Sequence, residues 1–261
     1  MSETNGKRPA RQPQTEWAIT RDQYDAVLLD LDGVITDTAR IHAACWKQMF
    51  DEYLQKRATQ RGEAFRPFDL ATDYRLYVDG KPRYDGVRDF LTSRGIRLPQ
   101  GSPDDPPQAE TVDGLGNRKN DLVNKIIEDK GVEPYEGSVE LVHQLRHQGF
   151  KIAVVTSSQN CTAVLKAAKL DHLFDVQVDG NTIHAQHLAG KPAPDTFLMG
   201  AKLLGVEPTR AIVIEDALSG VEAGRAGKFG LVIGVARKGT AEELRHHGAH
   251  LVVKDLKELV D

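Results

Sequence analysis

Short apolar runs alternate with amphipathic stretches in the C-terminal half of the chain, and one more such run lies near its start. The runs are typical of strands buried on both faces of a sheet, and they lie at residues 26–30, 151–156, 174–179, 211–215, 231–235 and 250–253. Apolar residues at helical spacing occupy the intervals, at about 137–148, 160–169, 194–204, 218–226 and 240–246. Strands separated by helices of this length predict βαβ units and a parallel sheet.

The interval from residue 39 to about 133 has a different pattern, which is helical in character and poor in strand signals. A first helix is predicted from Ala39, with Asp37 and Thr38 as candidates for its N-cap. Two further helices are predicted, at 84–94 and 120–130. Residues 98–117 are rich in Gly, Pro and Asp and predict an exposed loop between these two helices.

The first strand has no neighbouring strand in sequence until after this helical interval. We therefore predict an α/β fold with a doubly wound parallel-sheet (Rossmann-like) core, formed by residues 23–37 and 135–261. A helical cap domain is inserted at 38–134. Residues 1–22 lack the apolar core of a signal peptide and predict a disordered tail.

Composition narrows the class of protein. The chain of 261 residues has 40% hydrophobic and 28% charged residues, which suits a globular protein. A formal net charge of −4 with scattered basic residues gives no sign of nucleic-acid binding, and no apolar run approaches the roughly 20 residues needed to span a membrane. The only two cysteines, Cys45 and Cys161, lie in predicted helices. Reduced thiols and a cytoplasmic location are therefore expected.

The strongest chemical signal lies at residues 24–37. The apolar run there ends at two carboxylates, Asp30 and Asp32, followed by Gly33. Acids at the carboxyl end of a buried strand are costly for folding, and in an open α/β sheet this is where ligands bind. A solvated strand-to-loop junction also explains an isolated pair of this kind. However, three further clusters follow in the core, in the positions expected for one reaction centre.

Two of these clusters could bind phosphate. Thr156, Ser157 and Ser158 come between a predicted strand and a predicted helix, where hydroxyl groups and free amides bind phosphate or simply cap the helix. Lys191 lies in the segment Gly190–Asp195, where Pro192 and Pro194 hold the backbone, and it could neutralise a phosphate. Each feature alone has an ordinary explanation, as a helix cap or as a surface lysine.

The last cluster, Glu215 and Asp216, ends the strand at 211–214 as Asp30 ends the first strand. If the two strands are neighbours, Asp30 and Asp216 face each other across one crevice. Acids gathered without matching bases repel one another unless a cation lies among them. Carboxylate and carbonyl oxygens favour Mg²⁺ over zinc, and no paired set of Cys and His is present, so Mg²⁺ is the expected cofactor.

These motifs, in this order, resemble those of the haloacid dehalogenase superfamily. They are DxDGVxxD from Asp30, Thr/Ser after the second strand, K-P at Lys191 and E-D at Glu215. The resemblance covers nearly the whole chain from Tyr24. Other segments are similar to the β-phosphoglucomutase family within it, namely 30–38 with His42 and Trp46, 118–121, 158–160 and 191–195.

The resemblance implies roles for the core residues. Asp30 would be the nucleophile that forms an aspartyl phosphate. Asp32 would be the general acid/base and would offer its backbone carbonyl to the metal. Thr156 and Lys191 would hold the transferring phosphoryl group. The remaining metal ligands would be Asp216 and Glu215.

The resemblance also implies roles in substrate binding. His42 resembles a hinge histidine that couples cap closure to Asp32, and Arg83, in the loop that begins at Gly80, resembles an arginine that binds the distal phosphate of a sugar bisphosphate. The other implied contacts to substrate come from Trp46, Gly80, Lys119, Asn120, Ser157, Ser158 and Asn160.

The implied activity is Mg²⁺-dependent conversion of β-D-glucose 1-phosphate to glucose 6-phosphate, through β-glucose 1,6-bisphosphate. We expect a monomer. A sugar-phosphate phosphatase with the same core is the alternative, because water can take the phosphoryl group unless the cap excludes it. Arg83 and Lys119 favour the mutase, since only a mutase must bind two phosphates. A catalytically silent interaction module is disfavoured because it should have lost at least one of Asp30, Asp32, Lys191 and Asp216.

Three features depart from the family pattern. The cap carries extra segments near residues 59–73 and 99–114, Gln159 stands where lysine is frequent, and Ala217 stands where serine is common. None of them touches the expected centre of phosphoryl transfer. The first two leave the identity of the sugar open.

Overall fold

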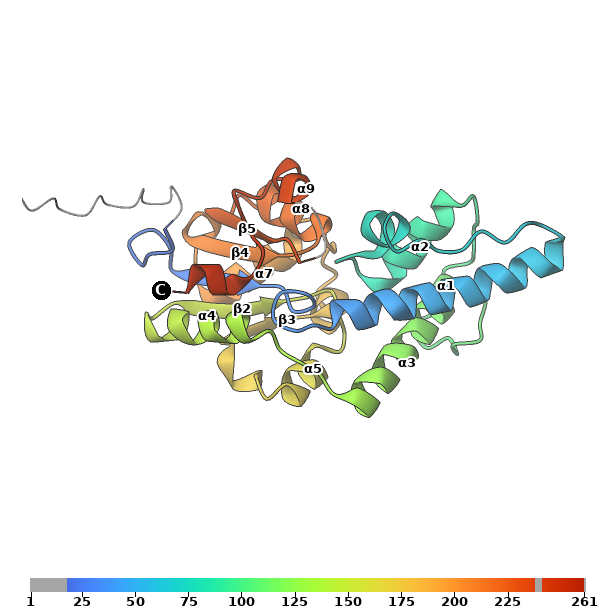
Figure 1. The fold of residues 1–261 in the computed structure, drawn as a ribbon, viewed down its shortest axis with the longest axis horizontal. Helices are drawn as coiled ribbons and strands as arrows, with labels where there is room; N and C mark the ends of the chain where they lie inside the picture. Colours follow the sequence, from blue (N-terminus) through green and yellow to red (C-terminus); the bar gives the residue numbers. More distant parts are fainter. Residues whose placement is uncertain (1–17, 238–240, 261) are drawn as a thin grey trace, which may run out of the picture.

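The computed structural model describes residues 18–237 and 241–260, and Figure 1 shows its fold. The predicted tail, 1–22, lies outside the described residues except for its last few positions. Six parallel strands form one sheet in the order β3-β2-β1-β4-β5-β6. Their bounds are β1 (Ala26–Leu29), β2 (Lys151–Val155), β3 (Val176–Val178), β4 (Ala211–Glu215), β5 (Leu231–Val235) and β6 (Leu251–Val253). Each strand lies within its predicted range, which confirms the doubly wound parallel sheet.

Helices cover both faces of this sheet. Val27 and Leu29 face a cluster formed with α4 (Glu136–His147) and α5 (Cys161–Ala167). Ala26 and Leu28, which alternate with them along β1, face the opposite cluster. The helices of that side are α7 (Asp195–Leu204), α8 (Leu218–Ala226) and α9 (Ala241–His246). Because the central strands β1, β4 and β5 are buried on both faces, their side chains are apolar almost throughout rather than alternating.

The predicted core helices are all present, and short helical segments accompany them. These are α6 (Gly180–Ala185) and three 3₁₀ segments, η2 (Asp171–Leu173), η3 (Pro208–Arg210) and η4 (Leu256–Leu259). The sequence did not predict α6. Asp179 caps it, because its side chain accepts a hydrogen bond from the backbone N–H of Thr182.

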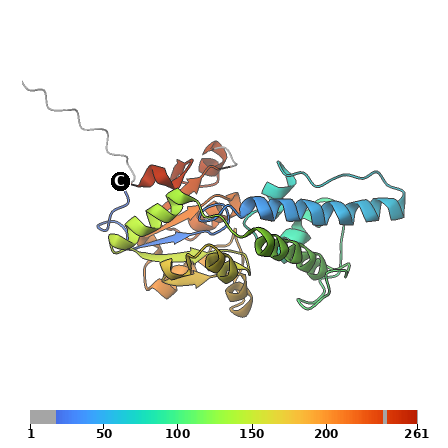
Figure 2. The same cartoon turned by 60° about the horizontal axis from the view of Figure 1, so that its bottom comes forward.

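The cap lies beyond one end of the sheet, as Figures 1 and 2 both show. It consists of α1 (Ala39–Arg61), a π-helical turn η1 (Tyr74–Val78), α2 (Arg83–Ser93) and α3 (Val112–Lys130). It has its own apolar cluster, in which the ring of Phe50 lies 5.0 Å from that of Phe68 and 4.3 Å from that of Phe90. Farther along α3, Val123 and Ile127 join the core cluster instead. The protein is thus a Rossmann-like core with a cap, whose exact limits stay a prediction.

The predicted loop at 98–117 is partly wrong, because α3 begins at Val112 rather than near residue 120. Val112 and Leu115 are buried in the cap cluster. The glycines that suggested a loop permit close packing within the helix instead. A Cβ atom at Gly116 would lie 2.6 Å from Cδ1 of Tyr84.

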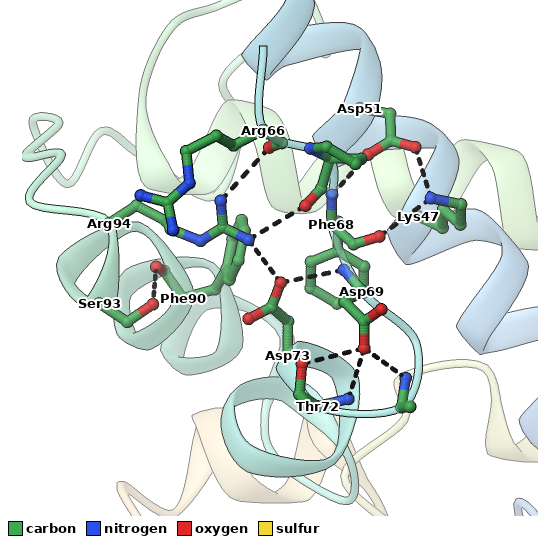
Figure 3. Close-up of polar contacts among 12 residues, drawn as sticks. Lys47, Asp51, Arg66, Phe68, Asp69, Thr72, Asp73, Phe90, Ser93 and Arg94 are labelled. Atoms are coloured by element: carbon green, nitrogen blue, oxygen red, sulfur yellow. Dashed lines mark hydrogen bonds and ion pairs between the residues drawn. The ribbon is translucent and has the colours of Figure 1, made fainter. Parts of the chain in front are cut away.

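The extra cap segment near residues 59–73 is held by polar contacts, which Figure 3 shows. The backbone N–H of Phe68 donates to Asp51 (2.7 Å), and Lys47 Nζ donates to Asp51 (2.8 Å) and to the carbonyl of Phe68 (2.9 Å). Arg94 donates to Asp73 (2.6 Å) and to the carbonyl of Pro67 (3.1 Å). We call Lys47, Asp51, Phe68, Asp73 and Arg94 the cap polar network.

Two further expectations concern the environment of the chain. Within the described ranges, no helix is long and apolar enough to cross a membrane. Cys45 and Cys161 are both buried free thiols, and burial raises the pKa of each. The prediction of reduced, buried cysteines is therefore confirmed.

Candidate active site

The predicted site residues meet at the carboxyl ends of the central strands. β1 pairs with β2 on one side and with β4 on the other, so Asp30, Thr156 and Glu215 leave the sheet side by side. Gly33, with φ of 99°, lets Asp216 approach, since a Cβ atom there would lie 2.0 Å from Asp216 Oδ2. The expected crevice between Asp30 and Asp216 is therefore present. A cavity of about 390 Å³ opens above it, between core and cap.

A buried ion-pair cluster forms the floor of this cavity. Lys191 Nζ donates to Asp30 Oδ1 (2.6 Å), to Glu215 Oε1 (2.6 Å) and to the carbonyl of Val155 (3.1 Å). The other oxygen of Asp30 accepts from the backbone N–H of Asp32 (2.9 Å), and that of Glu215 accepts from the N–H of Ala217 (2.9 Å). Both carboxylates are thus fixed in orientation, and they share one ammonium group.

Burial changes the proton affinities of this cluster. Loss of hydration raises the pKa of Asp30 well above its ordinary value, and the charges of Glu215 and Asp32 raise it further. Burial alone would lower the pKa of Lys191, but the carboxylates of Asp30 and Glu215 outweigh it and raise that pKa. Lys191 therefore stays protonated at neutral pH. Two carboxyl groups, those of Asp30 and Glu215, thus share one ammonium group.

The geometry fits a divalent cation. Asp30, Glu215 and Asp216 each offer an oxygen, and these atoms lie within 4.8 Å of one another. The donors are all carboxyl oxygens, which suit Mg²⁺, and three carboxyl groups gathered beside the single ammonium of Lys191 favour a further cation. The Asp32 side chain is not part of this group. Its backbone carbonyl stays a predicted ligand.

The side chain of Asp32 is held by three residues from two segments, the start of α1 and the end of β2. Thr38 donates to Asp32 Oδ1, Thr156 Oγ1 donates to Oδ2 (3.3 Å), and His42 Nε2 lies 3.5 Å from Oδ1. α1 begins at Ala39 as predicted, but Thr38 makes no side-chain capping bond there. Thr38 therefore occupies the N-cap position, as predicted, and its carbonyl accepts the first helical bond from His42, but its hydroxyl bonds Asp32 instead of the helix backbone. Sequence reasoning thus missed Thr38 as a site residue.

Cap residues extend this arrangement. Lys119 Nζ, on α3, lies 2.8 Å from Nδ1 of His42 and 5.0 Å from the centre of the Trp46 ring. Burial lowers the pKa of Lys119 to about 8. A chain of contacts thus runs from α3 through α1 to Asp32, and it joins predicted residues that are far apart in sequence.

Core and cap also meet at the mouth of the cavity. Ser157 Oγ donates to the carbonyl of Gly80 (2.7 Å), and Asn160 Nδ2 donates to Asn120 Oδ1 (3.0 Å). Arg83 Nη2 donates to Oε1 of Gln159. The two predicted sets of substrate contacts, one on the core and one on the cap, are therefore in direct contact.

Most predicted residues line the cavity. These are Asp30, Asp32, His42, Trp46, Gly80, Arg83, Lys119, Asn120, Thr156, Ser157, Ser158 and Asp216. Lys191 and Glu215 are buried beneath it, and Asn160 reaches only its edge through Asn120. Tyr74, Tyr84 and His184 also line it and were not predicted. Tyr74 belongs to the π-helical turn η1, which no apolar periodicity marks.

The fold and this site define the protein as a capped, Rossmann-like α/β enzyme with an acidic centre. The chain matches the haloacid dehalogenase-like hydrolase family over residues 24–228, and it belongs to that family. Within the family it is β-phosphoglucomutase-like.

Individual relatives agree with this placement. A β-phosphoglucomutase of Mycobacterium bovis is 55% identical over 92% of either chain. The fructose-1-phosphate phosphatase YqaB of Escherichia coli is 31% identical, covering 78% of this chain and 93% of the relative. The crystal structure of β-phosphoglucomutase from Clostridium difficile has a TM-score of 0.69 and 26% identity, covering 90% of this chain and 93% of that one. Relatives with both activities therefore share this fold.

Proposed function

We propose that the protein is a Mg²⁺-dependent β-phosphoglucomutase that converts β-D-glucose 1-phosphate to glucose 6-phosphate. Asp30 carries the phosphoryl group as an aspartyl phosphate, and β-glucose 1,6-bisphosphate is the intermediate. When bound at Asp30, Asp216 and the Asp32 carbonyl, Mg²⁺ neutralises charge on the transferring phosphoryl oxygens. The carboxyl group of Glu215 lies beside these ligands and adds a further oxygen to that site.

The proposed reaction has two transfers. In the first, the 6-hydroxyl of the sugar attacks phosphorus, the bond to Asp30 breaks, and Asp32 takes the hydroxyl proton. In the second, the bisphosphate binds in the opposite orientation and Asp30 attacks the phosphorus at C1. Asp32 then returns its proton to the departing oxygen, which leaves glucose 6-phosphate. Lys191 and Thr156 hold the phosphoryl oxygens in both transfers.

The observation that carries this proposal is the placement of cations at two ends of one cavity. Lys191 lies beneath it beside Asp30, whereas Arg83 and Lys119 line it from the cap. A substrate with two phosphates needs positive charge at both ends, one for the phosphoryl group in transfer and one for the other phosphate. A phosphatase for sugars with one phosphate needs only the first.

A sugar-phosphate phosphatase is the second candidate, favoured by the likeness to the fructose-1-phosphate phosphatase. One assay separates the two functions. Purified protein is given β-glucose 1-phosphate, Mg²⁺ and a trace of bisphosphate, and glucose 6-phosphate and free phosphate are followed together. The mutase produces glucose 6-phosphate with little free phosphate. Release of phosphate as the main product would establish the phosphatase instead.

Arg83→Ala tests the assignment of the cap. Removing the group that holds the distal phosphate should lower kcat/KM for β-glucose 1-phosphate by a factor that corresponds to a loss of a few kcal/mol of binding energy. Hydrolysis of acetyl phosphate, which has no distal phosphate, should fall much less. Arg61→Ala, at an exposed position at the end of α1, is the control. If both activities of Arg83→Ala collapse equally, Arg83 supports the fold rather than substrate binding.

We further propose that the enzyme is a monomer in the cytoplasm, with residues 38–134 as its cap domain. The reduced, buried cysteines support the location, and the separate apolar cluster of the cap supports the domain limits. Light scattering after size exclusion measures the oligomeric state. Limited proteolysis near residues 38 and 134 checks the limits of the cap.

A further inference from the structure

Residues 157–160, which follow β2, tie the core to the cap at three points. Ser157 donates to the carbonyl of Gly80, Gln159 accepts from Arg83, and Asn160 donates to Asn120. The three partners belong to different parts of the cap, namely the loop before α2, the first residue of α2, and α3. A four-residue segment therefore spans the cavity mouth.

Gln159 is held on the core side of this contact. Its backbone carbonyl accepts from Asn181 Nδ2 (3.1 Å), and α6 packs against it at Gly180. A Cβ atom at Gly180 would lie 2.7 Å from Cγ of Gln159. The backbone and the Cγ atom of Gln159 are thus packed against α6, with its amide directed to Arg83.

Arg83 is held on the cap side. Its guanidinium lies 5.2 Å from the centre of the Tyr84 ring, and its Nε is buried without a hydrogen-bond partner among the described residues. An arginine has five N–H donors, so the contact with Gln159 leaves donors for a ligand. Gln159 can therefore hold Arg83 in place while Arg83 still faces the cavity, which both residues line.

The chemistry of this contact differs from that of its two neighbours. The contacts of Ser157 and Asn160 are hydrogen bonds between neutral groups, whereas Gln159 accepts from a cation, which makes a stronger bond. Because the side-chain carbonyl of Gln159 is neutral and accepts from Arg83 directly, no anion is needed between the two residues to join core and cap. We propose that Gln159 is a positioning residue that holds the cap closed through Arg83, so that closure does not require a bound phosphate.

Substitutions at position 159 test this proposal by changing charge and acceptor separately. Gln159→Lys removes the acceptor and places two cations opposite each other. Gln159→Met removes the acceptor alone, and Gln159→Glu keeps an acceptor and adds negative charge. Gln48→Lys, on the exposed face of α1 next to Glu52, is the control for an added lysine. Hydrogen exchange of residues 76–92 measures cap closure, with β4 as the internal reference.

Gln159→Lys should increase exchange of residues 76–92 about tenfold or more, as expected for loss of a hydrogen bond to a charged group. Added inorganic phosphate should slow this exchange again, because an anion can bridge the two cations. Gln159→Met should show a smaller increase, whereas Gln159→Glu and Gln48→Lys should match the unsubstituted protein. If both Gln159→Lys and Gln159→Met exchange like the unsubstituted protein, the proposal is wrong. An increase that extends equally to β4 would show general destabilisation and would also overturn it.

A kinetic measurement adds a second readout, which rests on the proposed function. Gln159→Glu should raise KM for β-glucose 1-phosphate more than it lowers kcat, because its carboxylate competes with the distal phosphate for Arg83. An unchanged KM would contradict the placement of this contact at the substrate site. If the protein proves to have no mutase activity, the exchange measurement still decides whether Gln159 holds the cap, because it uses no substrate.

Discussion

The ion-pair cluster beneath the cavity and the cap polar network both join a basic side chain to aspartate, but they balance charge differently. In the cluster, Asp30 and Glu215 share the ammonium of Lys191, and all three side chains are almost fully buried. In the cap, Arg94 has its own partner in Asp73, and Lys47 has its own partner in Asp51. The remaining donors there bind backbone carbonyls.

This difference separates a structural network from a functional one. A balanced pair that also satisfies backbone carbonyls fixes a segment of chain, as the cap polar network fixes the extra segment shown in Figure 3. A buried cluster in which two carboxyl groups share one ammonium group costs stability. Such a cost is expected where the carboxyl groups are needed by a cation or a reaction. Substitutions in the two networks should therefore have different effects on stability and on activity.

Asp30→Asn should abolish turnover, because an amide of the same shape cannot act as the nucleophile. Mg²⁺ binding should weaken, since the site loses one carboxylate. The free energy of unfolding should be unchanged or higher, because burial disfavours the charge of Asp30. Steady-state kinetics and denaturant unfolding measure these effects. Transfer of labelled phosphate from the bisphosphate to the substituted protein would contradict the assignment.

Lys191→Met should lower the free energy of unfolding by about 3–5 kcal/mol, because it leaves Asp30 and Glu215 buried without their shared cation. Urea unfolding measures the loss. Raising Mg²⁺ should recover part of the stability, since the ion binds only the folded site. Lys191→Met with Asp30→Asn should lose less than Lys191→Met alone, and equal losses would show that the excess charge is not the cause.

The rate should depend on pH through Lys119, whose pKa is about 8. The amine is charged below this pH and neutral above it. We therefore expect kcat/KM for β-glucose 1-phosphate to fall as the pH rises through 8, approaching about tenfold per pH unit. The fall in kcat should begin at higher pH, because bound phosphate stabilises the charged form.

Lys119→Met should remove this alkaline fall and lower kcat/KM at neutral pH. Lys56→Met serves as the control, because Lys56 is exposed and pairs with Glu110 at 2.6 Å, away from the cavity. Its pH profile should match that of the unsubstituted protein. Persistence of the alkaline fall in Lys119→Met would assign it to another group.

The core could be predicted more fully than the cap, for a physical reason. The central strands β1, β4 and β5 are apolar runs buried on both faces, so a local pattern is enough to find them. The start of α3 does have a local signal, because the Thr111 side chain caps it by accepting from the N–H of Gly114. The glycines in its first turns suggested a loop instead, and their packing reason, the approach of Tyr84 to Gly116, joins residues far apart in sequence.

The site residues divide in the same way, into those that a local motif predicts and those that depend on contacts between distant parts of the chain. Asp30, Asp32 and Lys191 could be predicted because motifs of residue type and order carry them. The role of Thr38 at the site could not be predicted in this way. Its contact with Asp32 depends on how the chain folds back after β1. The contact between Arg83 and Gln159 joins residues 76 positions apart, on cap and core. Local spacing cannot predict such contacts, because they depend on how core and cap are placed together.

Arg94→Met should affect stability and leave catalysis unchanged. Arg94 donates to Asp73 and to the carbonyl of Pro67, and its guanidinium lies 5.0 Å from the centre of the Phe90 ring. Loss of hydrogen bonds from a charged group should lower the free energy of unfolding by about 1.5–3 kcal/mol. This loss of stability is smaller than that expected for Lys191→Met. Arg94→Met leaves the Asp73 carboxylate without its partner, and Asp73 is more exposed than Asp30 or Glu215.

The control is Arg61→Met, since Arg61 is 54% exposed and lies 4.0 Å from Glu63. Its effect on stability should stay within about 0.5 kcal/mol. Urea unfolding and kcat are measured for both variants, and kcat should match the unsubstituted protein in both. A large fall in kcat for Arg94→Met, with stability unchanged, would connect the cap polar network to the reaction. The two networks would then differ in their charge balance but not in their function.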